Sequence, residues 1–158
     1  MSAILQLTRL AIKLKRPEFE FAEYQDSPIA PLEKPLNKCS LALVTTGGLH
    51  MQSDPPFDFS MKEGDTSYRI IPTEADPAEI RISHNWYNHK FINADINCVF
   101  PIDRMKEYLN DGTIGSLSKE HYSFMGHIYD TEALIKRASY LGRHMKDSGV
   151  DIAFLTPT

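Results

Sequence analysis

Residues 39–51 read CSLALVTTGGLHM, and this segment decides the fold class of the chain. From Ser40 to Thr45 the segment is almost continuously apolar, and it ends at the glycine pair Gly47–Gly48. Continuous apolar character, in place of strict alternation, is typical of a strand that is covered on both faces. The segment therefore predicts a buried strand in a parallel α/β sheet.

A second buried strand is predicted at the other end of the chain, in VDIAFLTPT (150–158). It follows TEALIKRASYLGRHMKDSG (131–149), a helix that Asp130 or Thr131 caps and Gly149 ends. We expect its inner side to carry Ala133, Ile135, Ala138 and Leu141 or Gly142. Helix, glycine turn and apolar strand form half of a βαβ unit. We therefore expect Ser40–Thr45 and Val150–Leu155 to be adjacent parallel strands near the middle of the sheet.

The segments between these strands indicate a mixed sheet. SYRIIP (67–72) and EIRISH (79–84) predict two short strands, and the six residues between them are too few for a helical crossover. This pair should therefore be antiparallel or diverge. A helix is predicted over 101–112, and SLSKEHYSFMG (116–126) is expected to be a short connection with one helical turn. The predicted fold is α/β, a Rossmann-like open mixed sheet with helices on both faces.

Residues 1–39 are expected to precede this domain as an amphipathic helix and a proline-rich arm, leaving 40–158 as the α/β domain. Ile4, Leu7, Ala11 and Leu14 recur at helical spacing among basic residues. The charges fall inside and after the apolar positions, which does not match a secretory signal. The helix either docks on protein or lies on a membrane surface, and no transmembrane run is present in the sequence.

Composition excludes some classes of function. The 158 residues carry a formal net charge of −4, which offers no broad basic face for nucleic acid. The two cysteines, Cys39 and Cys98, are too few for a disulfide framework and are expected to be free, buried, unreactive thiols in a reducing cytoplasm.

Ligands of open α/β sheets bind beyond the carboxyl ends of the strands. Segments expected there, together with polar residues near them, give a candidate substrate site of Thr46, Gly47, Gly48, His50, His84, His121, Ser123, Thr156 and Thr158. The backbone N–H groups of the glycine pair and the histidines would favour a small carboxylate. Two other interpretations stay open, a plain glycine turn and structural histidines. No nucleotide-binding, zinc-binding or serine-nucleophile motif is present.

Four segments in this order give the chain a resemblance to a known family: VTTGGLHMQSDPPFD (44–58), GDTSYRIIP (64–72), the stretch from Ile82 to Gly126, and GVDIAFLTPT (149–158). Together they resemble the selenoprotein B family of glycine, sarcosine, betaine and D-proline reductases. The resemblance covers about Ala42 to Thr158. The family carries a redox selenocysteine, or a cysteine, directly after a strand end of the Leu-Thr-Pro-Thr type.

The resemblance implies that the catalytic residue comes directly after Thr158, with none inside the chain, and that the α/β domain is truncated at a selenocysteine codon. It implies reductive cleavage of a carbon–nitrogen bond in an amino-acid-like substrate, other reductase subunits as partners, and a pyruvoyl group on one of them. The chain alone would then be inactive. Apolar surface left by the missing part predicts a homodimer. The alternatives are a non-catalytic small-molecule binding or interaction domain, and a hydrolase that uses His50 or His84.

Overall fold

The computed structural model describes residues 3–15, 17, 26, 30–85 and 87–158. The chain divides into two units, Met1–Pro31 and Leu32–Thr158. In the first unit, helix α1 (Ala3–Lys15) forms where the apolar spacing predicts it, with Ile4 and Leu14 exposed. Residues 18–25 and 27–29 of the predicted proline-rich arm lie outside the described residues, and a domain boundary after residue 39 stays a prediction. None of the described helices is long and apolar enough to cross a membrane.

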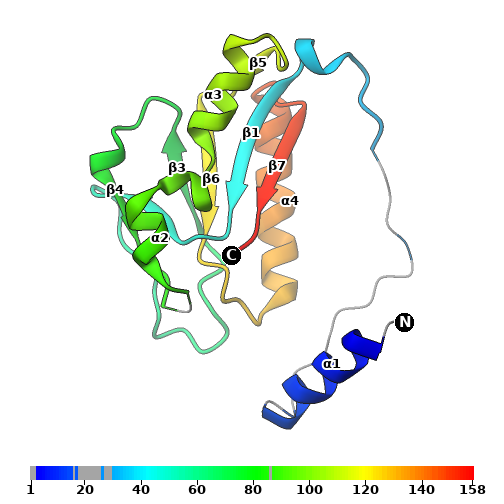
Figure 1. Cartoon of the computed structure of the whole chain (residues 1–158), viewed down its shortest axis with the longest axis vertical. Coiled ribbons are helices and arrows are strands. Elements are labelled where there is room, and N and C mark those ends of the chain that lie inside the picture. Colours follow the sequence, from blue (N-terminus) through cyan, green and yellow to red (C-terminus); the bar gives the residue numbers. More distant parts are fainter. Residues whose placement is uncertain (1–2, 16, 18–25, 27–29, 86) are drawn as a thin grey trace. The chain divides into compact units, whose positions relative to one another are not determined.

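The second unit is built on an open mixed sheet with β1 at its centre (Figure 1). β7 runs parallel to β1 along one whole side, from Leu41 opposite Ile152 to Thr45 opposite Thr156. β5 and β6 therefore share the other side of β1, both parallel to it, and β3 pairs antiparallel with β6. The strands of this sheet are β1 (Ser40–Thr45), β3 (Tyr68–Pro72), β5 (Ser116–Leu117), β6 (Glu120–Phe124) and β7 (Ile152–Thr156). The adjacency and parallel direction predicted for the first and last strands are confirmed.

A separate two-stranded sheet joins β2 (Leu49–Met51) to β4 (Ile80–Ile82) in antiparallel fashion. The two strands predicted at 67–72 and 79–84 therefore diverge into different sheets. The described connections include the short 3-10 turns η1 (Leu36–Lys38), η2 (Pro77–Glu79) and η3 (Ile96–Cys98).

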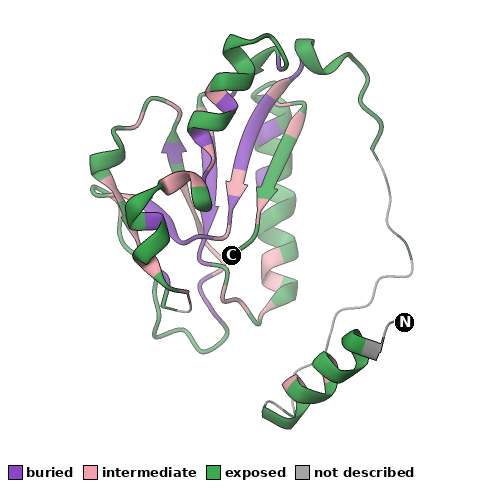
Figure 2. Cartoon of the chain, in the orientation of Figure 1, coloured by how far each residue is buried: buried purple, intermediate pink, exposed green. Residues whose placement is uncertain are grey.

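Helices cover both faces of the main sheet, as predicted. Successive side chains of β1 point to opposite faces of the sheet, so β1 contributes to a core on each face. Leu41 and Leu43 pack into a core with residues of α2 (His89–Ala94) and α3 (Ile102–Asn110). Ala42 packs on the other face with Tyr122 and with α4 (Thr131–Asp147). Figure 2 shows the resulting burial concentrated in β1 and β6. The architecture is a mixed α/β fold.

The last strand differs from its prediction. Within the described residues β7 pairs only with β1, so it is an edge strand and not a central one. Its side chains are correspondingly open, with Phe154 41% and Leu155 67% exposed. An apolar run of this kind predicts a buried strand. It does not show whether the strand has a neighbour on one side or on both, because strand pairing is a property of the whole sheet.

The largest correction concerns residues 116–126, which form β5 and β6 and not a helical turn. His121, Tyr122 and Ser123 are all fully buried between β1 and β3. Polar residues in a short segment favour a loop by composition, but here buried hydrogen bonds satisfy them, which permits a central strand.

The inner face of α4 is also shifted from the prediction. Asp130 caps the helix by accepting a hydrogen bond from the Ala133 N–H, as expected. The buried residues are Leu141 and Met145, with Leu134 packed against them, whereas Ile135 is 57% exposed. Helical periodicity fixes the spacing of an apolar stripe but not which of two overlapping stripes is buried. In α4 the stripe through Leu134 packs against Tyr122, and the predicted stripe through Ile135 does not.

Candidate functional site

Hydrogen bonds join the carboxyl ends of β1 and β7 through three residues, Thr46, Thr156 and Thr158. We call these three residues the threonine rim. The Thr158 N–H donates to Thr46 Oγ1 at 2.9 Å, and Thr158 Oγ1 donates to the Thr46 carbonyl at 3.0 Å. The Thr46 N–H in turn donates to the Thr156 carbonyl at 3.1 Å. These bonds hold the chain at Thr158 directly beside the end of the central strand, and Figure 1 shows the C-terminus there. Thr46, Thr156 and Thr158 are therefore brought together as predicted.

A second pair of threonine bonds anchors this rim to the loop after η3. Thr45 Oγ1 and Thr156 Oγ1 each donate to the Val99 carbonyl at 2.8 Å. Thr45 is fully buried, and its hydroxyl also accepts the Gly47 N–H at 3.1 Å. The Thr45 hydroxyl thus links β1, the glycine pair and the Val99 loop in one network.

We expect Thr45→Val to destabilise the domain by about 1–3 kcal/mol, because the isosteric methyl leaves the Gly47 N–H without an acceptor and removes one donor from Val99. The measurement is urea unfolding at pH 7. Thr45→Ser keeps the hydroxyl and is the matched control. Equal losses in the two variants would show that the lost methyl contact, and not the hydrogen bonds, carries the effect.

Both N–H groups of the glycine pair have acceptors inside the domain, which does not favour the predicted contact with an anion. The Gly47 N–H donates to Thr45 Oγ1, and the Gly48 N–H donates to the Phe124 carbonyl at 2.9 Å. The reason for glycine here is space and backbone conformation. Gly48 has φ +66°, and a Cβ placed on it would lie 2.4 Å from the Ser83 carbonyl oxygen. The pair lets the segment after β4 pack directly on the end of β1.

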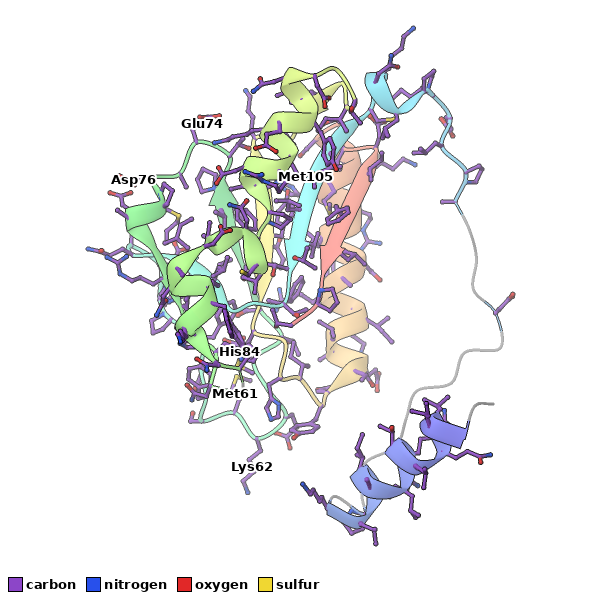
Figure 3. All side chains as sticks on the ribbon, viewed as in Figure 1. Met61, Lys62, Glu74, Asp76, His84 and Met105 are labelled. Carbon is purple, nitrogen blue, oxygen red and sulfur yellow. The ribbon has the colours of Figure 1, made fainter. Side chains whose placement is uncertain are left out.

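His84 lies at this rim and is buried, with 5% of the residue exposed. A Cβ placed on Gly126 would lie 3.2 Å from His84 Nε2 and 2.6 Å from the Thr46 carbonyl oxygen, so Nε2 faces the neighbourhood of Thr46 across a residue with no side chain. Figure 3 shows His84 at the end of the domain toward which the β1 and β7 arrows point. Burial lowers the pKa of His84, and the nearby His127 and His89 lower it further.

Several residues at the rim were not predicted from the sequence. The Tyr87 hydroxyl donates to the Gly47 carbonyl at 2.8 Å, and its ring lies between His84 and His89 with centroid distances of 4.6 and 4.9 Å. Burial raises the pKa of Tyr87 to about 12. His127 and Gly126 come from the segment after β6. The sequence signal for Tyr87 was the density of His, Tyr and Asn in residues 84–89. Nothing in that spacing shows that the segment 84–89 folds onto the glycine pair.

His50 and His121 are separately occupied. His50 lies in β2, where Nε2 is 2.9 Å from Ser83 Oγ and Nδ1 is 2.9 Å from the Met51 carbonyl. His121 is inside the core, where Nδ1 accepts the Leu43 N–H at 3.0 Å and Nε2 is 3.2 Å from Thr73 Oγ1. Because Nδ1 is an acceptor, the proton of the neutral ring is on Nε2.

Ser123 is likewise buried, and its hydroxyl accepts the Leu49 N–H at 2.7 Å. His50, His121 and Ser123 are thus hydrogen-bonded inside the domain. His84 lies beside the threonine rim.

The two cysteines differ from one another. Cys39 is free and fully buried, as predicted, whereas Cys98 in η3 is free and exposed. The apolar neighbours of Cys98 in the sequence suggested burial, but Cys98 at the end of η3 is exposed, whereas the next residue, Val99, is buried. Within the described ranges no group of three or more His, Cys, Asp and Glu side chains is placed to hold a metal ion.

Comparison with known proteins identifies the family. The model of the "Glycine/sarcosine/betaine reductase selenoprotein B" family matches residues 4–158, almost the whole chain. The chain therefore belongs to the selenoprotein B family of reductase components, as the sequence resemblance indicated. No solved structure matches the chain.

Two curated relatives show the range of the family. D-proline reductase subunit gamma of Acetoanaerobium sticklandii is 36% identical over 127 residues, covering 80% of this chain and 51% of the relative. Glycine reductase complex component B subunit gamma of Carboxydothermus hydrogenoformans is 27% identical over 143 residues, covering 89% of this chain and 33% of the relative. The chain thus spans about half of the first relative and about one third of the second.

Proposed function

We propose that this chain is the N-terminal portion of a reductase component of the selenoprotein B type, which cleaves a carbon–nitrogen bond of an amino-acid-like substrate. The observation that carries the proposal is the position of Thr158, which hydrogen bonds hold at the carboxyl end of the central strand. Reactive groups in open α/β sheets lie at this edge. We further propose a Rossmann-like use of the sheet, with substrate bound beyond the ends of β1 and β7.

In this proposal a selenocysteine, or a cysteine, follows Thr158. The group would supply a nucleophile that is already an anion near neutral pH, as lowered-pKa thiols do. The residues of this chain fit it in two ways. The threonine bonds fix the direction in which the chain leaves β7, and His84 presents an imidazole to the same rim. We assign the remaining site residues, Thr46, Gly47, Gly48 and Thr156, to building this rim.

Among substrates of the family, we favour D-proline or a similar cyclic amino acid. Support comes from the identity of 36% to the D-proline reductase subunit, against 27% and 28% to two glycine reductase subunits. Several relatives are named as components of reductase complexes, which supports other reductase subunits as partners. A pyruvoyl group on a partner subunit, a cytoplasmic location and a homodimer complete the proposal. The exposed Phe154 and Leu155 of β7 support self-association.

The test is to express the gene together with its downstream sequence in a host that inserts selenocysteine, and to analyse the purified product. We expect a product longer than 158 residues, with one selenium or one additional cysteine directly after Thr158 by mass spectrometry. With its partner subunits it should reduce D-proline in preference to glycine, sarcosine and betaine. Sedimentation at micromolar concentration should show a dimer. A product that ends at Thr158 and still binds a small amino acid would favour the non-catalytic alternative.

A further inference from the structure

We propose that helix α1 lies on the surface of an anionic membrane, with its exposed Leu and Ile side chains in the lipid and its lysines at the headgroups. This inference goes beyond the proposed function and does not depend on it. The surface is formed by the described residues of α1 alone, Ala3–Lys15.

Helix α1 carries a row of large apolar side chains that recur at intervals of three and four residues, which places them on one side of the helix. This apolar stripe consists of Ile4 (77% exposed), Leu7 (66%), Leu10 (59%) and Leu14 (77%). Figure 2 shows that α1 is exposed over most of its length. Several large apolar side chains exposed together on one side of a helix mark an interaction surface.

The charges of α1 are all positive. The helix contains Arg9, Lys13 and Lys15 and no acidic residue, although the whole chain has a formal net charge of −4. A partner with negative charge is therefore favoured. A second copy of α1 is disfavoured as the partner, because pairing two such helices brings like charges together.

The two lysines lie on either side of the apolar stripe. With about 3.6 residues per turn of an α-helix, Lys13 falls on one flank of the stripe and Lys15 on the other, and both are exposed. Long lysine side chains on both flanks reach phosphate headgroups while the apolar side chains between them enter the lipid. This is the arrangement of a helix that lies in the plane of a membrane surface.

The composition of α1 favours lipid over a groove in a partner protein. The apolar stripe is aliphatic throughout, and α1 contains no aromatic residue. Protein interfaces rely on aromatic and arginine anchors that fill shaped pockets. Aliphatic side chains on a cationic helix need no shaped pocket in a membrane, because fluid acyl chains surround them and anionic headgroups attract the lysines.

The experiment is sedimentation of the full-length protein with vesicles of phosphatidylcholine alone or of an equal mixture with phosphatidylglycerol. We expect binding to the mixed vesicles, and binding about tenfold weaker to phosphatidylcholine alone. Leu10→Gln should weaken binding to the mixed vesicles about tenfold, because one fewer apolar side chain enters the lipid. Gln and Leu have similar helix propensities, so the variant retains the helix.

Ile135→Gln is the matched control, because it makes the same kind of change at an exposed position of α4. It should bind like the wild type. Lys13→Gln should weaken binding to the mixed vesicles about fivefold and leave binding to phosphatidylcholine unchanged. Wild-type binding by Leu10→Gln, or equal binding of the wild type to the two kinds of vesicle, would overturn the inference.

A second measurement uses only the wild-type protein. Hydrogen exchange of the backbone amides is followed with and without the mixed vesicles, and we expect slower exchange in residues 3–15, because a short helix frays in water and binding stabilises it. Unchanged exchange there would contradict the inference. Slower exchange of residues 3–15 with purified partner subunits, and none with vesicles, would assign the apolar stripe to a protein groove instead. None of these outcomes bears on the proposed reductase function, which the mass and activity of the full-length product test.

Discussion

Between pH 6.5 and pH 4 we expect the domain to lose about 3 kcal/mol of stability through a single residue, His121. The imidazole is fully buried in β6, and burial, with the nearby Lys106, lowers its pKa from 6.5 to about 4. The native state therefore stays unprotonated through a range in which the unfolded chain binds a proton. Because the unfolded state binds more protons there, stability rises with pH, at most about 1.4 kcal/mol for each pH unit.

The contribution of His121 is thus fully present above pH 6.5 and is lost as the pH falls toward 4. Protonation would also cost the hydrogen bond that Nδ1 accepts from the Leu43 N–H in the central strand. Urea unfolding measured at half-unit intervals of pH is the check. His121→Gln keeps an acceptor and a donor but does not titrate in this range, and it should flatten the pH dependence even where it lowers stability at pH 7. An unchanged slope in His121→Gln would contradict the prediction.

Gly48→Ala should cost about 3 kcal/mol or more, a large loss for a single added methyl group. Two penalties act together. Gly48 has φ +66°, where a residue with a side chain is strained by about 1–2 kcal/mol. The new methyl would also lie 2.4 Å from the Ser83 carbonyl oxygen, and backbone cannot move aside as a flexible side chain does. The segment from Ser83 to His84 would have to leave the rim.

The matched control for this prediction is Gly149→Ala. Gly149 also has a positive φ, +78°, but an added Cβ there would meet nothing within 4 Å. Its cost should be the conformational penalty alone, about 1–2 kcal/mol. Urea unfolding at pH 7 gives the loss in free energy of unfolding for each variant. The difference between the two losses is the cost of the contact with the Ser83 carbonyl oxygen. Equal losses at the two positions would show that the backbone around Gly48 adapts without cost.

The parts of the fold that the sequence predicts well are those that local patterns specify. The strand at Ser40–Thr45 and the helix capped by Asp130 appear where the apolar run and the capping signal place them. The strand at Tyr68–Pro72 follows its apolar pattern in the same way. Each of these signals lies within a few residues of the element it specifies, so neighbouring chain segments are not needed to interpret it.

The parts that were predicted incorrectly are those in which a distant partner decides the outcome. His121 and Ser123 favour a loop by composition, but the Leu43 and Leu49 N–H groups give their side chains buried hydrogen-bond partners and make a central strand possible. Cys98 lies in an apolar stretch but faces outward. β7 has the composition of a central strand but has a described partner on only one side.

The candidate site divides in the same way. The sequence placed Thr46, Thr156 and Thr158 after parallel strands, and the geometry of such sheets brings their ends together regardless of detail. It could not show that the N–H groups of Gly47 and Gly48 already have acceptors, because Thr45 Oγ1 and the Phe124 carbonyl become neighbours only in the folded sheet. It also gave no means of choosing among the histidines.

For this protein, then, the amino-acid sequence by itself determined the class of fold, the parallel pairing of its first and last strands, and the family. These follow from apolar periodicity, chain direction and ordered motifs, which are properties of a linear chain. Tertiary structure alone decided that His84 lies beside the threonine rim and that His50 and His121 bond to Ser83 and Leu43, because a side chain's role depends on which groups surround it. Those groups come from segments tens of residues away, which only folding brings within 3 Å.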